Sequence, residues 1–182
     1  METTVKTKWG IDPTHSEISF KVKHLMISTV TGVFTRYESI IETEGESLVT
    51  AKGSFSADVN SITTFNDQRD GHLRTADFFD EANHHKVSFL VERVEKVSDE
   101  NYAIYGTFSM RGVSKRISLN AEFGGLTKDQ WGNTKIGLSL TGKINRKDFG
   151  VNFGLLDDAT SAIVSNEVKL IANVQFIKQA EV

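Results

Sequence analysis

The sequence predicts an all-β protein, an eight-stranded antiparallel barrel with a short helical insert at about residues 64–80. Three observations predict this fold. Apolar and polar residues alternate along most of the chain, which is typical of strands that bury one face. About eight such runs follow one another, most of them ten or more residues long, and short turns separate them. Residues 64–80 interrupt the alternation with a helical pattern.

The first half of the chain contains three predicted strands. Residues 16–25 alternate regularly, with Phe20 and Val22 on the apolar side. Residues 30–44 form a longer and less regular run. Residues 49–61 follow after a turn, and we expect them to form a hairpin with that run.

The insert at residues 64–80 is predicted to contain one or two short helical turns. Thr64 followed by Asp67 fits a capping box, in which side chains satisfy the first backbone N–H groups of a helix. Phe78 and Phe79 lie on its apolar side and need an apolar surface to pack on. We therefore expect the insert to plug or roof one end of the barrel.

The second half of the chain repeats the alternation in five further runs. Their expected inward residues are Val87, Phe89 and Val91; Tyr102, Ile104, Gly106, Phe108 and Met110; Ile117, Leu119, Ala121 and Phe123; Ile136, Leu138, Leu140, Gly142 and Ile144; and Val168, Leu170, Ala172, Val174 and Phe176.

Strand length favours a closed barrel over a β-sandwich, which is the alternative. Strands of ten or more residues at ~3.3 Å per residue span ~35 Å, which is long for a sandwich. Closure also removes exposed sheet edges. We therefore expect an up-and-down barrel of the lipocalin kind.

An eight-stranded barrel is either filled by its own side chains or holds one ligand. The expected inward positions mix small residues (Ala51, Gly53, Ala57, Gly106, Ala121, Gly142, Ala172) with large ones (Phe20, Phe55, Phe89, Phe108, Phe123, Phe176). The small residues fit a nested, fully packed core and an open channel equally well. The pattern alone leaves both alternatives open.

Composition excludes several classes of protein. With 182 residues, the chain is expected to form one domain over residues 1–182. The net charge of −3 with interspersed signs gives no case for nucleic acid binding, and the absence of cysteine excludes disulfides and thiolate metal sites. No apolar run approaches the ~20 residues of a membrane span. Residues 1–8 lack the apolar core of a secretory signal, so we expect a cytoplasmic protein.

The histidines have a structural and a functional interpretation. His24 is in phase with Phe20 and Val22, so a hydrogen-bonded core histidine is favoured there over a ligand contact. His84 and His85 are adjacent and would point to opposite faces of an extended chain. We therefore expect them to be solvated, and we predict no metal site.

Three further polar residues belong to the helical insert. Arg69, His72 and Arg74 are candidates for contacting a quinone carbonyl or a phosphate at the barrel mouth. The favoured alternative is that they pair with the nearby carboxylates Asp70, Asp77 and Asp80. Elsewhere, Arg146 and Asp148 are expected to form a structural ion pair.

No catalytic motif is present. The sequence contains neither Gly-x-Ser-x-Gly nor His-Glu-x-x-His, and it has no glycine-rich phosphate loop. The chain is therefore not expected to be an enzyme. The alternative is a small enzyme that acts on a ligand in the lumen, with His24, His72 or Asp77 as acid or base.

The order and spacing of several short segments resemble the YceI-like family of polyisoprenoid-binding barrels. The matching segments are 15–24, 30–34, 58–64, 69–80, 106–108, 129–132 and 146–150. Two departures stand out. His84 and His85 replace a usual aromatic–proline pair, and residues 151–153 lack a tryptophan that often follows the Asp-Phe-Gly. The second departure could reshape one end of the cavity.

The resemblance implies a barrel that holds a long isoprenoid chain, such as a polyprenyl lipid or an isoprenoid quinone, as carrier, store or sequestering protein. It also suggests a homodimer. No other cofactor is expected. The expected lumen residues are Phe20, Val22, Phe55, Ala57, Phe78, Phe79, Phe89, Phe108, Leu119, Leu138, Leu170, Ala172 and Phe176, and the candidate headgroup residues are His24, Arg69, His72 and Arg74.

Overall fold

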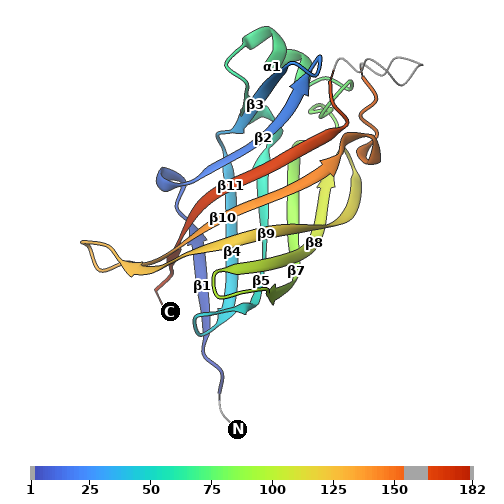
Figure 1. Ribbon diagram of the computed structural model, residues 1–182. Helices are drawn as coiled ribbons and strands as arrows, with labels where there is room; N and C mark the ends of the chain where they lie inside the picture. Colours follow the sequence, from blue (N-terminus) through green and yellow to red (C-terminus); the bar gives the residue numbers. More distant parts are fainter. Residues whose placement is uncertain (1–2, 154–163, 181–182) are drawn as a thin grey trace.

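A computed structural model describes residues 3–153 and 164–180 (Figure 1). Its elements, in chain order, are β1 (Lys6–Ile11), η1 (Pro13–His15), β2 (Glu17–His24), β3 (Ser28–Phe34), β4 (Tyr37–Glu44), β5 (Ser47–Asp58), η2 (Val59–Ser61), β6 (Ile62–Thr63), α1 (Asp67–Leu73), β7 (Lys86–Lys96), β8 (Asn101–Met110), β9 (Val113–Lys128), β10 (Thr134–Asn145), η3 (Arg146–Phe149) and β11 (Glu167–Lys178). No helix of these residues combines the length and hydropathy that a membrane span needs.

Eight strands close into an antiparallel barrel, as predicted. The ring runs β1-β4-β5-β7-β8-β9-β10-β11, and pairing between β1 and β11 closes it. Trp9 lies opposite Lys178 at this closure. From β4 to β11 each ring strand pairs with the next one in the chain, which is the expected up-and-down order.

Three short strands extend the sheet beyond the ring. β2 pairs with β11, β3 with β2, and β6 with β3. β11 therefore changes its neighbour along its length, from β1 at Phe176–Lys178 to β2 at Lys169–Asn173. In Figure 1 the β2–β3 hairpin rises from the side of the barrel toward α1.

Two expectations about the first half of the chain are wrong in detail. Residues 16–25 do form a strand, but the ring is closed by β1, which was not predicted. Residues 30–44 are divided into β3 and β4 at Thr35 and Arg36. The break is stabilised because Thr35 donates from its backbone nitrogen and its hydroxyl to the carbonyl of Ser61, at 3.2 and 3.1 Å.

The helical insert contains one short α-helix and a series of turns. The N-cap is Asn66, whose side chain accepts from the backbone N–H of Arg69 at 2.9 Å. The expected capping box of Thr64 and Asp67 is therefore wrong. Thr64 instead donates its backbone N–H and its hydroxyl to the buried carboxylate of Asp70.

The insert roofs one end of the barrel, as expected. Phe78 and Phe79 pack against the core cluster at that end, and the Phe79 ring lies 6.0 Å from the rings of both Phe20 and Phe34. Gly32 makes this packing possible, because a Cβ there would lie 2.2 Å from the Phe20 ring. A second cluster, around Trp9 and Phe176, fills the other end of the barrel.

Candidate functional site

The barrel encloses a cavity of about 400 Å³. This volume falls within the range of known ligand pockets, about 300–1,000 Å³. The walls are mainly aliphatic and aromatic side chains from both core clusters. Of the two alternatives left open by the sequence, the structure has the channel.

All thirteen expected lumen residues line this cavity, namely Phe20, Val22, Phe55, Ala57, Phe78, Phe79, Phe89, Phe108, Leu119, Leu138, Leu170, Ala172 and Phe176. They reach it because alternate side chains of a strand point to the same face. In β11, for example, Leu170, Ala172 and Phe176 all face inward. Whether these residues bind a ligand stays a prediction.

The cavity reaches the surface at the end that carries α1 and η3. Four of its lining residues there are exposed, and we call Lys23, His24, Arg69 and Phe153 the rim. A fifth exposed lining residue, Ser54, lies in the barrel wall. At the opposite end the lining residues, such as Leu48 and Val94, are buried or half-buried.

Every charged residue among the described cavity-lining residues is basic. The set comprises Lys23, Arg69 and Arg146, together with the titratable side chains of His24 and His72, and contains no aspartate or glutamate. All five lie at the rim end, on β2, α1 and η3. The lumen is thus apolar along its length and basic at one end.

The headgroup candidates are only partly brought together. His24, Arg69 and His72 line the cavity, whereas Arg74 does not. Arg74 donates to the carbonyl of Ile62 at 3.3 Å. Its Nε is buried without a partner among the described residues. His24 is exposed at the rim, so the expectation of a core histidine is wrong.

The expected pairing of these residues with carboxylates holds for one of the three. His72 Nε2 lies 2.8 Å from the Asp77 carboxylate, and its ring contacts Phe153 edge-on at 4.7 Å. Arg69 instead donates to Thr64, through Nε to the hydroxyl at 2.7 Å and through Nη2 to the carbonyl at 2.8 Å. The rim arginine therefore lies close to the cavity and forms no direct ion pair with a described carboxylate; the Asp70 carboxylate is linked to it only through the Thr64 hydroxyl.

Arg146 is the cavity residue that sequence reasoning misassigned. It is 3% exposed and donates to the backbone carbonyls of Val151, Phe153, Val164 and Ser165, at 2.6–3.3 Å. The expected pair with Asp148 is wrong, because no described carboxylate lies within ion-pair distance of it. Burial lowers the pKa of its guanidinium from the ordinary value. The signals in the sequence were a break in the alternation after Asn145 and the match of residues 146–150 to the family pattern.

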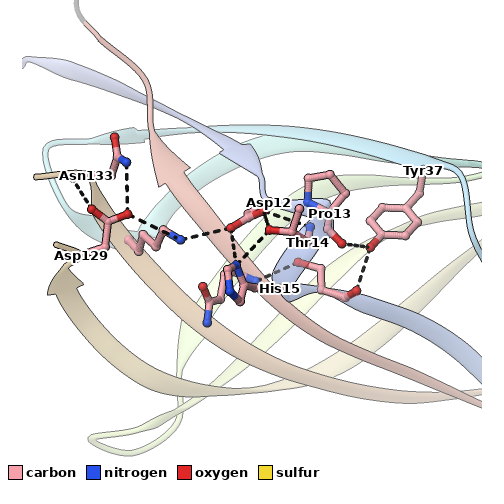
Figure 2. A network of polar contacts seen from close by, with 10 residues as sticks. Asp12, Pro13, Thr14, His15, Tyr37, Asp129 and Asn133 are labelled. Atoms are coloured by element: carbon pink, nitrogen blue, oxygen red, sulfur yellow. Dashed lines mark hydrogen bonds and ion pairs between the residues drawn. The ribbon is translucent and has the colours of Figure 1, made fainter. Parts of the chain in front are cut away.

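A second polar cluster lies on the outside of the barrel, where the chain passes from β1 to β2 (Figure 2). Asp12 accepts from the Thr14 backbone N–H at 3.0 Å, and its other oxygen lies 2.8 Å from His15 Nδ1 and 3.1 Å from Lys135 Nζ. Lys135 also lies 3.7 Å from Asp129. We call these five residues the latch.

The charged centre of the latch, Asp12, Lys135 and Asp129, is paired and largely buried. The side chains of Asp12 and Lys135 are 8% and 13% exposed. Burial by itself raises the pKa of Asp12, but hydrogen bonds from Thr14, His15 and Lys135 outweigh it and hold the pKa well below its usual range. Because Lys135 belongs to β10 and Asp12 follows β1, the latch ties the closing strand to the wall.

The two adjacent histidines show no metal geometry. His84 Nε2 lies 3.9 Å from Asp80, and His85 Nδ1 lies 3.6 Å from Glu81. Over residues 3–153 and 164–180, no three histidine or carboxylate side chains are grouped as metal ligands would be.

A closed antiparallel barrel around an apolar cavity, open at a basic rim, defines a lipocalin-like barrel. The family model for the YceI-like domain matches residues 9–176. The chain therefore belongs to the YceI-like family, which confirms the resemblance seen in the sequence.

Related sequences and solved structures agree with this family assignment. A UPF0312 protein of Staphylococcus epidermidis is 30% identical over 171 residues, which cover 93% of this chain and 97% of the relative. The crystal structure of a Campylobacter jejuni YceI protein is 34% identical, with a TM-score of 0.75 over 87% of this chain and 90% of that one. A polyisoprenoid binding domain from Saccharophagus degradans shares the fold at 17% identity, with a TM-score of 0.70 over 94% of this chain and 98% of that one.

Proposed function

We propose that this protein binds a long-chain isoprenoid or a similar amphiphilic lipid, of the polyprenyl or quinone type, in the barrel lumen. The observation that carries the proposal is the polarity of the cavity. Its body is lined by apolar side chains, and its charged lining residues all lie at one end. An amphiphile with one long chain and one polar head has the same division.

The apolar body of the cavity supports binding of the chain. At ~0.8 kcal/mol per buried CH2, about twenty chain carbons would contribute ~16 kcal/mol before costs. Ordering a flexible chain and losing its free motion offset much of this. We expect the remainder to suffice for binding of a neutral hydrocarbon chain.

The basic end supports placement of the head. Arg69, His72 and His24 line the cavity there, and their donors suit a quinone carbonyl or a phosphate. Arg146 contributes mainly its charge, since its N–H groups are already directed to backbone carbonyls. The family membership and the polyisoprenoid binding domain from Saccharophagus degradans support the same class of ligand.

Solvent extraction of the purified protein followed by mass spectrometry tests the proposal. We expect an unaltered long-chain lipid at a constant ratio to protein. A protein that yields no lipid and takes up none of an added polyprenol or isoprenoid quinone would contradict it.

Filling the cavity sharpens this test. Ala172→Trp and Ala57→Phe extend side chains that line the lumen, so we expect lipid content to fall while the melting temperature hardly changes. In a tightly packed core the same changes would cost ~1–3 kcal/mol of stability. Ala103→Trp, on β8 outside the cavity lining, is the matched control. Strong destabilisation by both lumen variants, with no loss of lipid, would count against the channel.

We propose binding rather than catalysis, with carriage, storage or sequestration as the role. The enzyme alternative would use His72 and Asp77, which are already within hydrogen-bond distance of each other. It predicts chemical change of an added isoprenoid, whereas a carrier returns it unaltered. A cytoplasmic location and a homodimer remain predictions, to be checked by fractionation and by sedimentation.

A further inference from the structure

The turn between β2 and β3 exposes three consecutive apolar residues. Leu25, Met26 and Ile27 are 51%, 62% and 84% exposed, and none of them lines the cavity. They follow directly after His24 of the rim. Figure 1 shows this turn beside α1, at the end of the molecule where the cavity reaches the surface. We call residues 25–27 the tip.

The backbone of the tip is unfavourable for the residues that form it. Leu25 and Met26 have φ angles of 50° and 58°, and the N–H of Ile27 donates to the carbonyl of His24 at 3.1 Å. Two central residues with positive φ are what a type I′ turn requires, and Asn-Gly is preferred there. Bulky side chains are strained in this region. The tip thus keeps apolar side chains where folding favours small polar ones.

The surface below the tip is basic. The chain has no aspartate or glutamate from Ile18 to Tyr37, although the whole protein carries a net charge of −3. Lys21 lies opposite Lys169, which lies opposite Lys143, so three exposed lysines stand in one row across β2, β11 and β10. Like charges in such a row destabilise a sheet. Only Lys143 of this row has a carboxylate partner among the described residues, Glu167 at 3.5 Å.

From these observations we infer that the tip is a membrane-docking element that enters the headgroup region of an anionic lipid bilayer. The apolar side chains would leave water, and Lys21 and Lys23 would lie near lipid phosphates. Exposed Asp67 and Asp77 lie on the α1 side, so the tip rather than α1 would face the bilayer. The rim would then open at the bilayer surface. The use of this contact for loading a lipid rests on the proposed function, whereas the contact itself does not.

Co-flotation with vesicles tests the inference. We expect the protein to float with vesicles that contain phosphatidylglycerol at about one lipid in three, and much less with phosphatidylcholine alone, because each lysine gains from anionic lipid. Met26→Ser with Ile27→Ser should weaken this binding about tenfold or more. Lys21→Gln with Lys169→Gln should weaken binding to the anionic vesicles alone.

Two controls separate docking at the tip from other causes. Val97→Ser removes an exposed apolar side chain from the β7–β8 turn, and Trp131→Ser removes one from the β9–β10 loop. Both connections lie at the opposite end of the antiparallel barrel from the β2–β3 turn. Neither control should change vesicle binding.

A tip variant that is expected to stabilise the turn separates loss of docking from a folding defect. Leu25→Asn with Met26→Gly matches the preference of the turn, so it should raise the melting temperature while weakening vesicle binding about tenfold. Its extracted lipid should match that of the wild type, which separates failure of docking from failure of the proposed function. Absence of wild-type binding to anionic vesicles, equal loss in the control variants, or a tip variant that changes only self-association in sedimentation would each overturn the inference.

Discussion

The latch and the rim end are two charged regions of one barrel, and they differ in how their charges are paired. In the latch, Lys135 lies between the carboxylates of Asp12 and Asp129, and every group has a partner at short range (Figure 2). At the rim end, Arg69 and Arg146 donate to hydroxyl and carbonyl oxygens, and neither forms a direct ion pair with a described carboxylate.

This difference separates structural charges from charges available to a ligand. A buried cation that already lies between two carboxylates, such as Lys135, has little attraction left for an anionic ligand. A cation held by neutral oxygens is kept in position but retains its field. The latch therefore serves the closure of the barrel, and the rim end is the region where a polar head would be recognised. The following predictions test this division, beginning with the largest effect.

Replacement of Arg146 should have the largest effect on stability. Arg146→Met removes the donors for four backbone carbonyls, those of Val151, Phe153, Val164 and Ser165. Buried acceptors left without donors are costly, so we expect a loss of ~3 kcal/mol or more in the free energy of unfolding. Urea denaturation measures it, with exposed Lys147→Met as the control. A loss below ~1 kcal/mol would mean that these carbonyls find other donors.

Replacement of Asp12 should have a smaller effect that depends on pH. Asp12→Asn keeps the shape but removes the charge facing Lys135 and His15, at an expected cost of ~2 kcal/mol near neutral pH. The pKa of Asp12 is lowered in the folded protein, so its contribution is fully present above the ordinary value of about 4 and is lost as pH falls toward the lower folded pKa.

Acid titrations of both proteins check this sign. The wild type should lose stability on acidification below about pH 4 more steeply than Asp12→Asn, and the two should converge at low pH. Asp99→Asn, in the exposed β7–β8 turn, is the control. Extracted lipid should be the same in all three proteins. If Asp12→Asn lost lipid without a change in stability, the latch would take part in ligand binding and would not be a purely structural cluster.

The barrel could be predicted from the sequence because its walls alternate. Phe89, Phe108 and Leu138 face the lumen as their period-two phase requires. β1 was missed because it is only six residues long and its inward side begins with Thr7, so only Trp9 and Ile11 alternate as apolar residues. Thr7 is buried, and Thr43 of the neighbouring β4 accepts from the Trp9 indole at 2.9 Å. Two apolar residues beside a buried, hydrogen-bonded threonine are too short a pattern to identify a strand.

Only part of the candidate site could be predicted from the sequence, because some of its residues owe their positions to irregular local structure. Arg146 finds its partners on backbone carbonyls of irregular segments, and such partners have no sequence signature. Lys23 lies in the outward phase of β2 and reaches the rim because the strand ends there. His72 and Asp77 were recognised as a candidate pair because they are close in sequence.

Replacement of Arg69 should have the smallest effect on stability and a selective effect on binding. Arg69 is exposed, but its guanidinium donates to the hydroxyl and the carbonyl of buried Thr64, so Arg69→Gln should lower the free energy of unfolding by only ~1 kcal/mol. Its charge faces the cavity, and charge-assisted contacts to phosphate are worth more than neutral ones. We therefore expect affinity for a polyprenyl phosphate to fall by about threefold to tenfold, with that for the polyprenol of equal length unchanged. Arg116→Gln, which removes an exposed outer-wall arginine paired with Glu92, is the matched control. An equal loss for phosphate and alcohol would show that Arg69 shapes the opening, and an unchanged affinity for both would move the head to the other end of the cavity.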